Sequence, residues 1–184
     1  MALAARTELR IAGTGGQGLI LGATMLAKAL LAAGRRIAQS QTYEPTSRGG
    51  YCNADVIVSD REVDYPLATT LDALVLLDQL AVEPSWPLLK PGALVLADTR
   101  WVHHLPAGDM RAYRLPMTRK AIDLGSERVA NVVALGALAA LAGLCDRATL
   151  ESTIRAETPR AYVDLNLDAV AAGFHIAAEL TAPA

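Results

Sequence analysis

The sequence predicts an α/β fold, a Rossmann-like three-layer sandwich with a mostly parallel sheet and a helical C-terminal part. Segments of strand-like and helix-like pattern alternate along the first half of the chain, and two later runs are apolar and almost free of charge. A glycine-rich turn joins the first expected strand to the first expected helix. No linker or internal repeat divides the 184 residues, so we expect residues 1–184 to form a single domain.

The first half of the chain supplies three of the expected strands. The patterns predict strands at residues 8–12, 36–42 and 51–59, and a helix at 17–33 that is ended by Gly34. Asp60 and Arg61 predict a hairpin turn that leads into an extended segment at 62–65.

The second half contains the runs that are typical of central parallel strands. Residues 71–77 (LDALVLL) and 93–97 (ALVLA) are predicted to be strands buried on both faces, with a short helix or turn between them. A further strand is expected at 111–115. The rest is predicted to be mainly helical, with Asp146 as the N-cap of a helix at 147–157 and a last helix at 164–180.

Composition excludes several classes of protein. Hydrophobic residues make up 52% of the chain and charged residues 20%, which excludes an intrinsically disordered chain. The net charge of −2 shows no basic bias, so no nucleic-acid partner is expected. The only cysteines, Cys52 and Cys145, form neither a disulfide framework nor a four-thiolate iron–sulfur site, and we expect a cytoplasmic protein.

Two predicted helices are unusually apolar. Residues 129–145 form a nearly uncharged run whose length is at the lower limit for a membrane span. Asn131 and the small residues favour a helix buried in protein instead. The helix at 17–33 has few polar residues on any side. Each helix is expected either to be covered by another chain or to be a core helix of a compact domain.

The turn Gly13-Thr14-Gly15-Gly16-Gln17-Gly18 matches the GxGxxG pattern of dinucleotide-binding proteins. Its glycines allow a close approach to the backbone, and the free N–H groups of the following helix favour an anion. However, the end of the second strand reads QSQT at 39–42, where a dinucleotide site requires a carboxylate. Dinucleotide binding and a purely packing role for the glycines both remain open.

The polar loop 43–50 (YEPTSRGG) follows the second strand and is expected at the same sheet edge as the glycine turn. Arg48, beside Gly49 and Gly50, can present a guanidinium and open N–H groups to a phosphate or a carboxylate. A solvated loop arginine is the alternative.

Together these motifs resemble a known family. The motifs are GTGGQG near the N-terminus, QTYEPTSRGG after the second strand, and then NADVIVSD, LDALVLLDQ, KPGALVLADT and NVVALGALAALAGL. In this order, over residues 9–173, they resemble the gamma subunit of 2-oxoacid:ferredoxin oxidoreductases. The YEPTSRGG and NVVALGAL segments are most similar to the 2-oxoglutarate branch. The pyruvate and indolepyruvate branches are the alternatives within the family, and a free-standing NAD(P)- or flavin-binding oxidoreductase is the alternative outside it.

The resemblance implies a reaction in which a 2-oxoacid, CoA and oxidised ferredoxin give acyl-CoA, CO2 and reduced ferredoxin. It implies alpha and beta partner subunits that carry thiamine diphosphate, Mg²⁺ and iron–sulfur clusters, with CoA as a co-substrate and ferredoxin as the electron acceptor. This chain is expected to bind none of these cofactors alone, because it lacks a thiamine-binding motif and has two cysteines. Its implied role is structural, with control of access to the CoA site.

No catalytic residue and no metal ligand is predicted in this chain. The resemblance and the motifs place the CoA or partner interface at nine residues, namely Gly13, Gly15, Gly16, Gln17, Gly18, Arg48, Gly49, Gly50 and Asn131. Asn131 could instead be only the first residue of a helix. His103 and His104 are adjacent, with no third ligand at a suitable spacing, so a metal site there is not expected. Asp78, which follows a buried strand, is expected to be either functional or the cap of the next helix.

Overall fold

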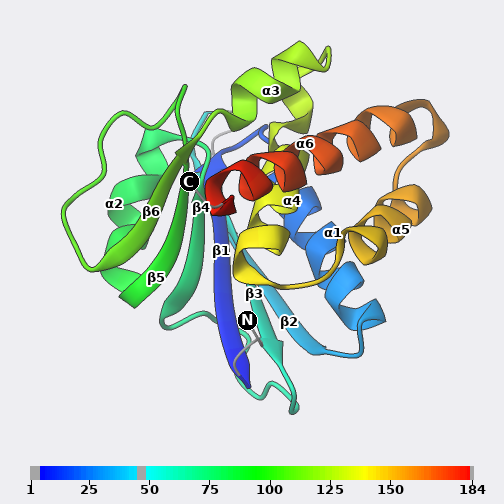
Figure 1. Cartoon of the computed structure of the whole chain (residues 1–184). Coiled ribbons are helices and arrows are strands. Elements are labelled where there is room, and N and C mark those ends of the chain that lie inside the picture. Colours follow the sequence, from blue (N-terminus) through cyan, green and yellow to red (C-terminus); the bar gives the residue numbers. More distant parts are fainter. Residues whose placement is uncertain (1–4, 45–48, 183–184) are drawn as a thin grey trace.

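The computed structural model describes residues 5–44 and 49–182, and in these residues six strands form one sheet (Figure 1). The strand order is β2-β3-β1-β4-β5-β6. β3 pairs antiparallel with both β1 and β2, whereas β1, β4, β5 and β6 pair in parallel, so five strands run in one direction. The strands are β1 (Arg6–Thr14), β2 (Arg36–Tyr43), β3 (Tyr51–Ser59), β4 (Leu71–Leu76), β5 (Leu89–Asp98) and β6 (Met110–Leu115).

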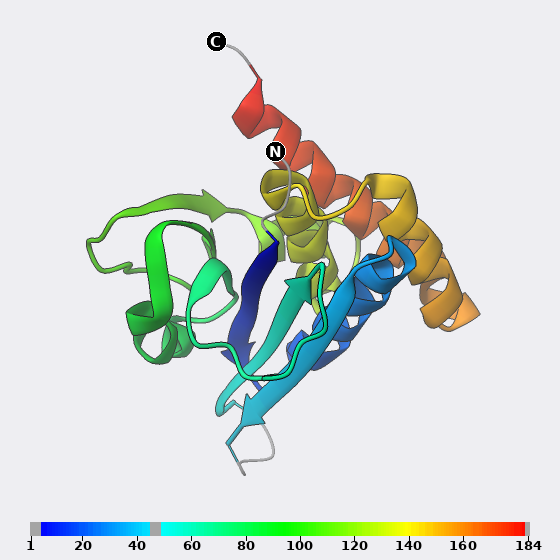
Figure 2. The ribbon, with the colours of Figure 1, turned by 90° about the horizontal axis from the view of Figure 1, so that it is seen from below.

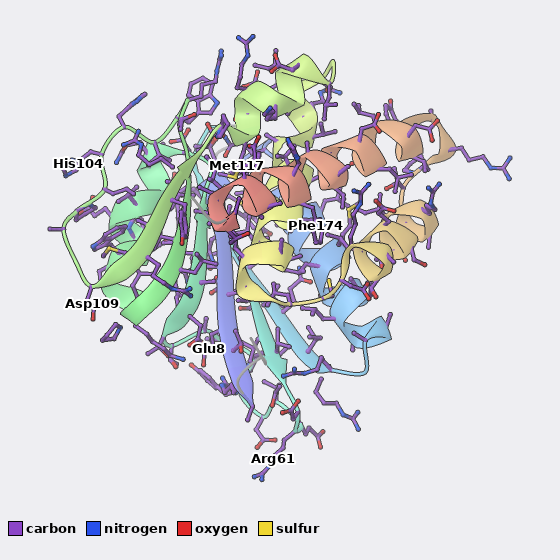
Figure 3. The ribbon with its side chains drawn as sticks, viewed as in Figure 1. Glu8, Arg61, His104, Asp109, Met117 and Phe174 are labelled. Atoms are coloured by element: carbon purple, nitrogen blue, oxygen red, sulfur yellow. The ribbon has the colours of Figure 1, made fainter. Side chains whose placement is uncertain are left out.

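One face of the sheet carries the long helices. α1 and α4 lie against the strands, α5 packs beside α1, and α6 crosses the outer side of α4 (Figures 1 and 2). Figure 3 shows Met117 where β6 runs into α3, and Phe174 on α6. The helices are α1 (Leu19–Ala32), α3 (Met117–Asp123), α4 (Ala130–Ala142), α5 (Arg147–Glu157) and α6 (Val163–Thr181), with short 3₁₀ turns at Glu127–Val129 and Arg160–Tyr162.

The opposite face is covered more thinly. α2 (Val82–Ser85) lies between the 3₁₀ turns Gln79–Ala81 and Trp86–Leu88, and covers apolar side chains of β4 and β5 such as Leu74, Leu76 and Val95. The predicted three-layer α/β fold with a mostly parallel sheet and a helical C-terminal part is therefore confirmed, with a third layer made of one short helix and irregular chain.

The predicted hairpin after the third strand is wrong. β3 ends at Ser59, and residues 60–70 form no strand. Instead, the carboxylate of Glu8 on β1 accepts hydrogen bonds from the N–H groups of Thr69 (2.7 Å) and Thr70 (3.2 Å). These contacts fasten the end of the segment to β1 and satisfy two of its backbone N–H groups without a second hairpin strand.

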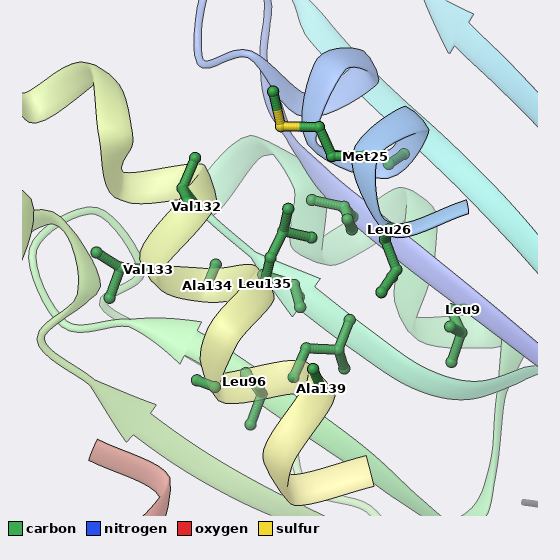
Figure 4. Close-up of a cluster of buried hydrophobic side chains, with 14 of the residues drawn as sticks. Leu9, Met25, Leu26, Leu96, Val132, Val133, Ala134, Leu135 and Ala139 are labelled. Carbon is green, nitrogen blue, oxygen red and sulfur yellow. The ribbon is translucent and has the colours of Figure 1, made fainter. Parts of the chain in front are cut away.

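The apolar helix at 129–145 is a core helix. All ten residues of α4 from Ala130 to Ala139 are buried, between the sheet on one side and α6 on the other. Figure 4 shows Val132, Leu135 and Ala139 of α4 in one cluster with Met25 and Leu26 of α1, and the same cluster includes Leu9 of β1. The alternative of cover by another chain is not needed for this helix, because α6 supplies the cover.

Two glycines allow α6 to lie on α4 at very short range. A Cβ at Gly136 would lie 2.5 Å from the carbonyl oxygen of Val170, and a Cβ at Gly173 would lie 2.7 Å from the nitrogen of Ala137. The helix backbones therefore touch where they cross. This contact lets the apolar side chains of α6, such as Val170 and Ile176, join the same core cluster as those of α4.

Helix α1 is also mainly a core helix. Eight of its residues are buried, and its outer side pairs with α5 through Lys28 and Glu157. It begins at Leu19 rather than at residue 17, because Gly18 takes a left-handed conformation (φ 72°) just before it. Leu21 and Leu31 remain 57% and 53% exposed, so any apolar contact with another chain is limited to these ends of the helix.

Candidate functional site

The predicted site residues lie at the carboxyl edge of the sheet, where the strand order changes direction. From β1 the chain continues toward β2 and β3 on one side of the sheet, and from β4 it continues toward β5 and β6 on the other. The ends of β1 and β4 therefore border the crevice in which open α/β sheets usually bind ligands. The glycine turn, residues 13–18, lies at this crevice.

Gln17 closes the crevice with its own side chain. Its Oε1 accepts the N–H of Thr14 at 2.8 Å, and its Nε2 donates to the carbonyl of Leu77, just beyond β4, at 2.9 Å. A Cβ at Gly13 would collide with Gln17 Oε1, so a larger residue there would displace the amide. The amide thus joins the ends of β1 and β4, and part of the glycine pattern exists to accommodate it.

Asn131 holds the other end of the turn. Its Nδ2 donates to the carbonyl of Gly18 at 2.9 Å, and its Oδ1 accepts the N–H of Val132 at 2.9 Å. Asn131 is 4% exposed, and a Cβ at Gly18 would lie 2.7 Å from its Nδ2. The side chain therefore ties the start of α4 to the start of α1.

The loop after β2 returns to the same turn. The N–H of Gly15 donates to the carbonyl of Gly50 at 2.9 Å, and the N–H of Gly49 donates to the carbonyl of Gly15 at 3.4 Å. The expectation that this loop meets the glycine turn is confirmed for Gly49 and Gly50. Arg48 lies outside the described residues.

A cavity of about 390 Å³ opens between the turn and the ends of β2 and β3. Gly15, Gly16 and Gly18 form its polar side, together with the first residues of α1, whose N–H groups have no acceptor within the helix. Leu21 and Tyr43 also line it and are 57% and 64% exposed. The cavity thus combines backbone donors at a helix start with an apolar rim, an arrangement that suits an anionic group attached to an apolar one.

A buried ion pair lies on the thin-layer face of the sheet, close to this edge. Arg10 on β1 binds Asp55 on β3 through two hydrogen bonds of 2.7 and 2.8 Å, and Asn53 donates to the same carboxylate at 2.9 Å. Burial by itself lowers the pKa of Arg10, but Asp55 outweighs it and the pKa is raised. Burial also raises the pKa of the neighbouring Tyr51, which lines the cavity. This pair was not predicted from the sequence, although Arg10 and Asp55 are charged residues within strands of otherwise apolar pattern, which was a visible signal.

The other candidates lie elsewhere and have local roles. Asp78 caps the next turn by accepting the N–H of Leu80 at 2.9 Å. The backbone N–H groups of His103 and His104 bind Gln79 Oε1, and within residues 5–44 and 49–182 no three His, Cys, Asp or Glu side chains gather as a metal site would require. Burial raises the pKa of both cysteine thiols, that of Cys145 to about 11.

The position of β3 argues against a conventional dinucleotide site. In that site the second strand lies directly beside the first, so that an acidic residue at its end reaches the ribose. Here β3 separates β2 from β1, and the end of β2 carries no carboxylate within residues 39–42. Gln17 also fills the space beside Gly13, the first glycine of the pattern.

Residues 8–176 match the family model described as pyruvate ferredoxin/flavodoxin oxidoreductase. The chain belongs to this family. Its resemblance to the gamma subunits of 2-oxoacid:ferredoxin oxidoreductases is confirmed by a solved structure, the keto/oxoacid ferredoxin oxidoreductase gamma subunit of Geobacter sulfurreducens. That protein is 39% identical, with a TM-score of 0.87 over 96% of this chain and 98% of the other.

Curated relatives agree over nearly their whole length. The 2-oxoglutarate synthase subunit KorC of Methanocaldococcus jannaschii is 35% identical over 179 residues, covering 95% of this chain and 96% of the relative. KorC of Methanothermobacter thermautotrophicus is 36% identical, with 91% and 93% covered. Another similar protein is the 2-oxoglutarate:ferredoxin oxidoreductase of Magnetococcus marinus, whose structure was solved with 2-oxoglutarate, coenzyme A and succinyl-CoA bound. Its sequence is 26% identical and the TM-score is 0.85, and the match covers 97% of this chain and 32% of that one. In the described part of this chain no helix has both the length and the apolar character of a membrane span.

Proposed function

We propose that this chain is the gamma subunit of a 2-oxoglutarate:ferredoxin oxidoreductase, which converts 2-oxoglutarate and CoA to succinyl-CoA and CO2 and passes the electrons to ferredoxin. The observation that carries the proposal is the full-length similarity to KorC subunits. The chain then works as one part of an enzyme whose alpha and beta subunits carry the chemistry. A soluble cytoplasmic complex is part of the same proposal.

The residues of this chain fit partner-borne cofactors better than cofactors of its own. A cysteine-ligated cluster needs several thiolates together, and Cys52 lies in β3 whereas Cys145 lies between α4 and α5. Burial keeps the pKa of each thiol above its ordinary value, which disfavours the thiolate that a metal needs. We therefore assign the iron–sulfur clusters, thiamine diphosphate and Mg²⁺ to the alpha and beta subunits.

The contribution of this chain is a fixed polar edge against a partner subunit or the phosphates of CoA. The nine predicted residues are retained for this interface: Gly13, Gly15, Gly16, Gln17, Gly18, Arg48, Gly49, Gly50 and Asn131. Gln17 and Asn131 use their amides to hold the turn in one conformation, so the open N–H groups at the start of α1 are in place before a ligand arrives. The cavity of about 390 Å³ beside them, with its apolar rim, fits a phosphate-bearing chain such as CoA.

A branch for another 2-oxoacid is the second candidate. The ketoisovalerate oxidoreductase subunit VorA of Methanothermobacter marburgensis is 31% identical over 170 residues, but this chain covers only 35% of that relative. The KorC relatives are more similar and match in length, which favours 2-oxoglutarate.

The test is to purify the protein from its native source under reducing, oxygen-free conditions and identify what accompanies it. We expect a brown complex with two or more other chains, thiamine diphosphate and ferredoxin-reducing activity that prefers 2-oxoglutarate in a panel of 2-oxoacids. Activity confined to a branched 2-oxoacid would reassign the branch. A colourless protein that purifies alone and binds NAD tightly would overturn the proposal.

The interface assignment is tested separately in the assembled enzyme. Arg48→Ala should raise the KM for CoA or weaken subunit association, whereas Arg155→Ala, an exposed change on α5, should do neither. If Arg48→Ala leaves the KM for CoA, turnover and assembly all unchanged, the assigned role of the loop is wrong.

A further inference from the structure

A second cavity lies on the other side of the glycine turn from the one described above. Its volume is about 230 Å³, and it opens at the crevice between the ends of β1 and β4. Gln17 and Leu77, which bridge the two strands, form its floor. Trp101, Thr118, Glu127 and Arg128 stand around it, and we call this cavity the crevice pocket.

Thr118 brings an unused hydroxyl to the crevice pocket. The residue is only 2% exposed, and its N–H donates to the buried carboxylate of Asp98 at 2.6 Å. Its hydroxyl makes no hydrogen bond with any residue that the structure describes. The hydroxyl oxygen keeps some accessible surface at the pocket, so it can donate to a group that enters from outside the chain.

The other donors at the crevice pocket favour a negative charge. Arg128 has no ion pair or hydrogen bond within the described part of the chain, and it lies two residues before the buried start of α4, a helix of 13 residues. The positive end of the α4 dipole therefore faces the same space, which Ala130 also lines. Gly16 lines the pocket too, with a φ of 105°, and its N–H has no recorded acceptor among the described residues.

Glu127 limits which anion fits. It is exposed and also lines the crevice pocket, so the ionisable side chains around the pocket carry no net charge. A polyanion would be repelled by this carboxylate, whereas a single anionic group is attracted by Arg128 and by the helix end. Trp101, whose ring lies 5.3 Å from the guanidinium carbon of Arg100, supplies a flat apolar wall.

We propose that the crevice pocket binds one carboxylate or phosphate group, with the Thr118 hydroxyl and the Arg128 guanidinium as its main donors. The group comes either from a small free anion or from an acidic side chain of a partner subunit. This site is separate from the cavity assigned above to CoA or a partner, although Gly16 borders both. It does not depend on which 2-oxoacid the complex uses.

The experiment compares variants of the protein as it is purified, with whatever partners it retains. Thr118→Val removes the hydroxyl at nearly constant shape, and Thr118→Ser restores it. Arg128→Gln removes the charge at an exposed position where folding is not at risk, and Arg155→Gln is the matched charge control on α5. Each protein is titrated calorimetrically with inorganic phosphate and with acetate at constant ionic strength, and its assembly is followed by native mass spectrometry as salt is raised.

Two results support the proposal and identify the source of the anion. If the site takes a free anion, wild type binds phosphate or acetate saturably, Arg128→Gln weakens binding at least tenfold, and Thr118→Val weakens it severalfold with recovery in Thr118→Ser. If a partner's acidic side chain fills the site, no free anion binds, and both variants dissociate at lower salt than wild type and Arg155→Gln.

The proposal is overturned if Arg128→Gln and Thr118→Val change neither anion affinity nor assembly, including the case in which an anion binds all variants equally. This outcome is independent of the co-purification test, because a complex of any activity can be titrated in the same way.

Discussion

Replacing Gly173 by alanine should strongly destabilise the protein, because the added methyl group has no space between α4 and α6. Its Cβ would collide with the carbonyl oxygen of Val133 and would lie 2.7 Å from the nitrogen of Ala137 and 2.8 Å from the Cα of Gly136. All three atoms belong to the backbone of a buried helix, so no side chain can rotate away. Helix α6 must shift outward along the line where it covers the apolar surface of α4.

The magnitude follows from two opposing effects. Overpacking a well-packed site costs up to about 3 kcal/mol, and the rigid neighbours place this site at that end of the range. Alanine is preferred over glycine within a helix by about 1 kcal/mol, which offsets part of the cost. We expect a net loss of about 2 kcal/mol, and a melting temperature lower by roughly 4–8 °C for a chain of this size.

Gly22→Ala is the matched control, because it makes the same change within a buried helix where space exists. A Cβ there would lie 3.6 Å from Asn131 Nδ2 and 3.6 Å from Leu135 Cδ1, which is ordinary contact. It should therefore stabilise the protein by up to about 1 kcal/mol. Urea unfolding of the three proteins, followed by far-UV circular dichroism, compares them directly. If Gly173→Ala unfolds at the same urea concentration as wild type or at a higher one, the close α4–α6 crossing is refuted.

Three further predictions concern charged and thiol groups. Asp55→Asn should lower the free energy of unfolding, measured in urea, by about 3 kcal/mol, because it leaves Arg10 buried without its counter-charge. The double variant Arg10→Met, Asp55→Leu should recover most of this loss. Equal stability of Asp55→Asn and wild type would contradict the buried pair. Burial acts to raise the pKa of Glu8, but the N–H groups of Thr69 and Thr70 and the charge of Arg6 outweigh it and lower the pKa below its ordinary value of 4.5. Its contribution to stability is therefore complete above pH 4.5 and lost as the pH falls through the lowered pKa, and Glu8→Gln should flatten that part of the pH–stability curve. Burial, with a smaller effect of Asp146, raises the pKa of Cys145 to about 11. Iodoacetamide at pH 8 should therefore leave Cys145 unmodified in the folded protein and alkylate it in urea, and mass spectrometry can measure the modification.

The strands that were easiest to predict are those whose environment is uniform. β4 and β5 are covered on both faces, so their side chains are apolar without alternation, and the sequence alone identifies them. The cap at Asp146 was also predictable, since its carboxylate needs only the N–H of Thr149, three residues away, which it binds at 2.7 Å. In each case the information lies within a few residues of the chain.

The parts that were missed depend on residues far apart in the sequence. Nothing local in residues 51–59 shows that β3 lies between β1 and β2, because the pairing is selected by contacts such as Arg10 with Asp55. Likewise, the cover of α4 depends on the approach of Gly173 to Gly136, and the inward direction of Gln17 depends on the carbonyl of Leu77. Local patterns could bring the glycine turn and the loop at 43–50 to one sheet edge, but could not show what each glycine accommodates.

The glycine turn shows why a GxGxxG pattern by itself does not establish dinucleotide binding. Gly13 makes room for the Gln17 amide, and Gly18, with its left-handed φ of 72°, makes room for Asn131, so two of the four glycines are explained by contacts within the chain. The same contacts leave the N–H groups at the start of α1 directed at open space, in a turn that is held without a ligand. In this protein the glycine turn, which holds a coenzyme in many α/β folds, is a rigid edge of the sheet with a cavity on each side. Such an edge suits a subunit that positions groups supplied by its neighbours.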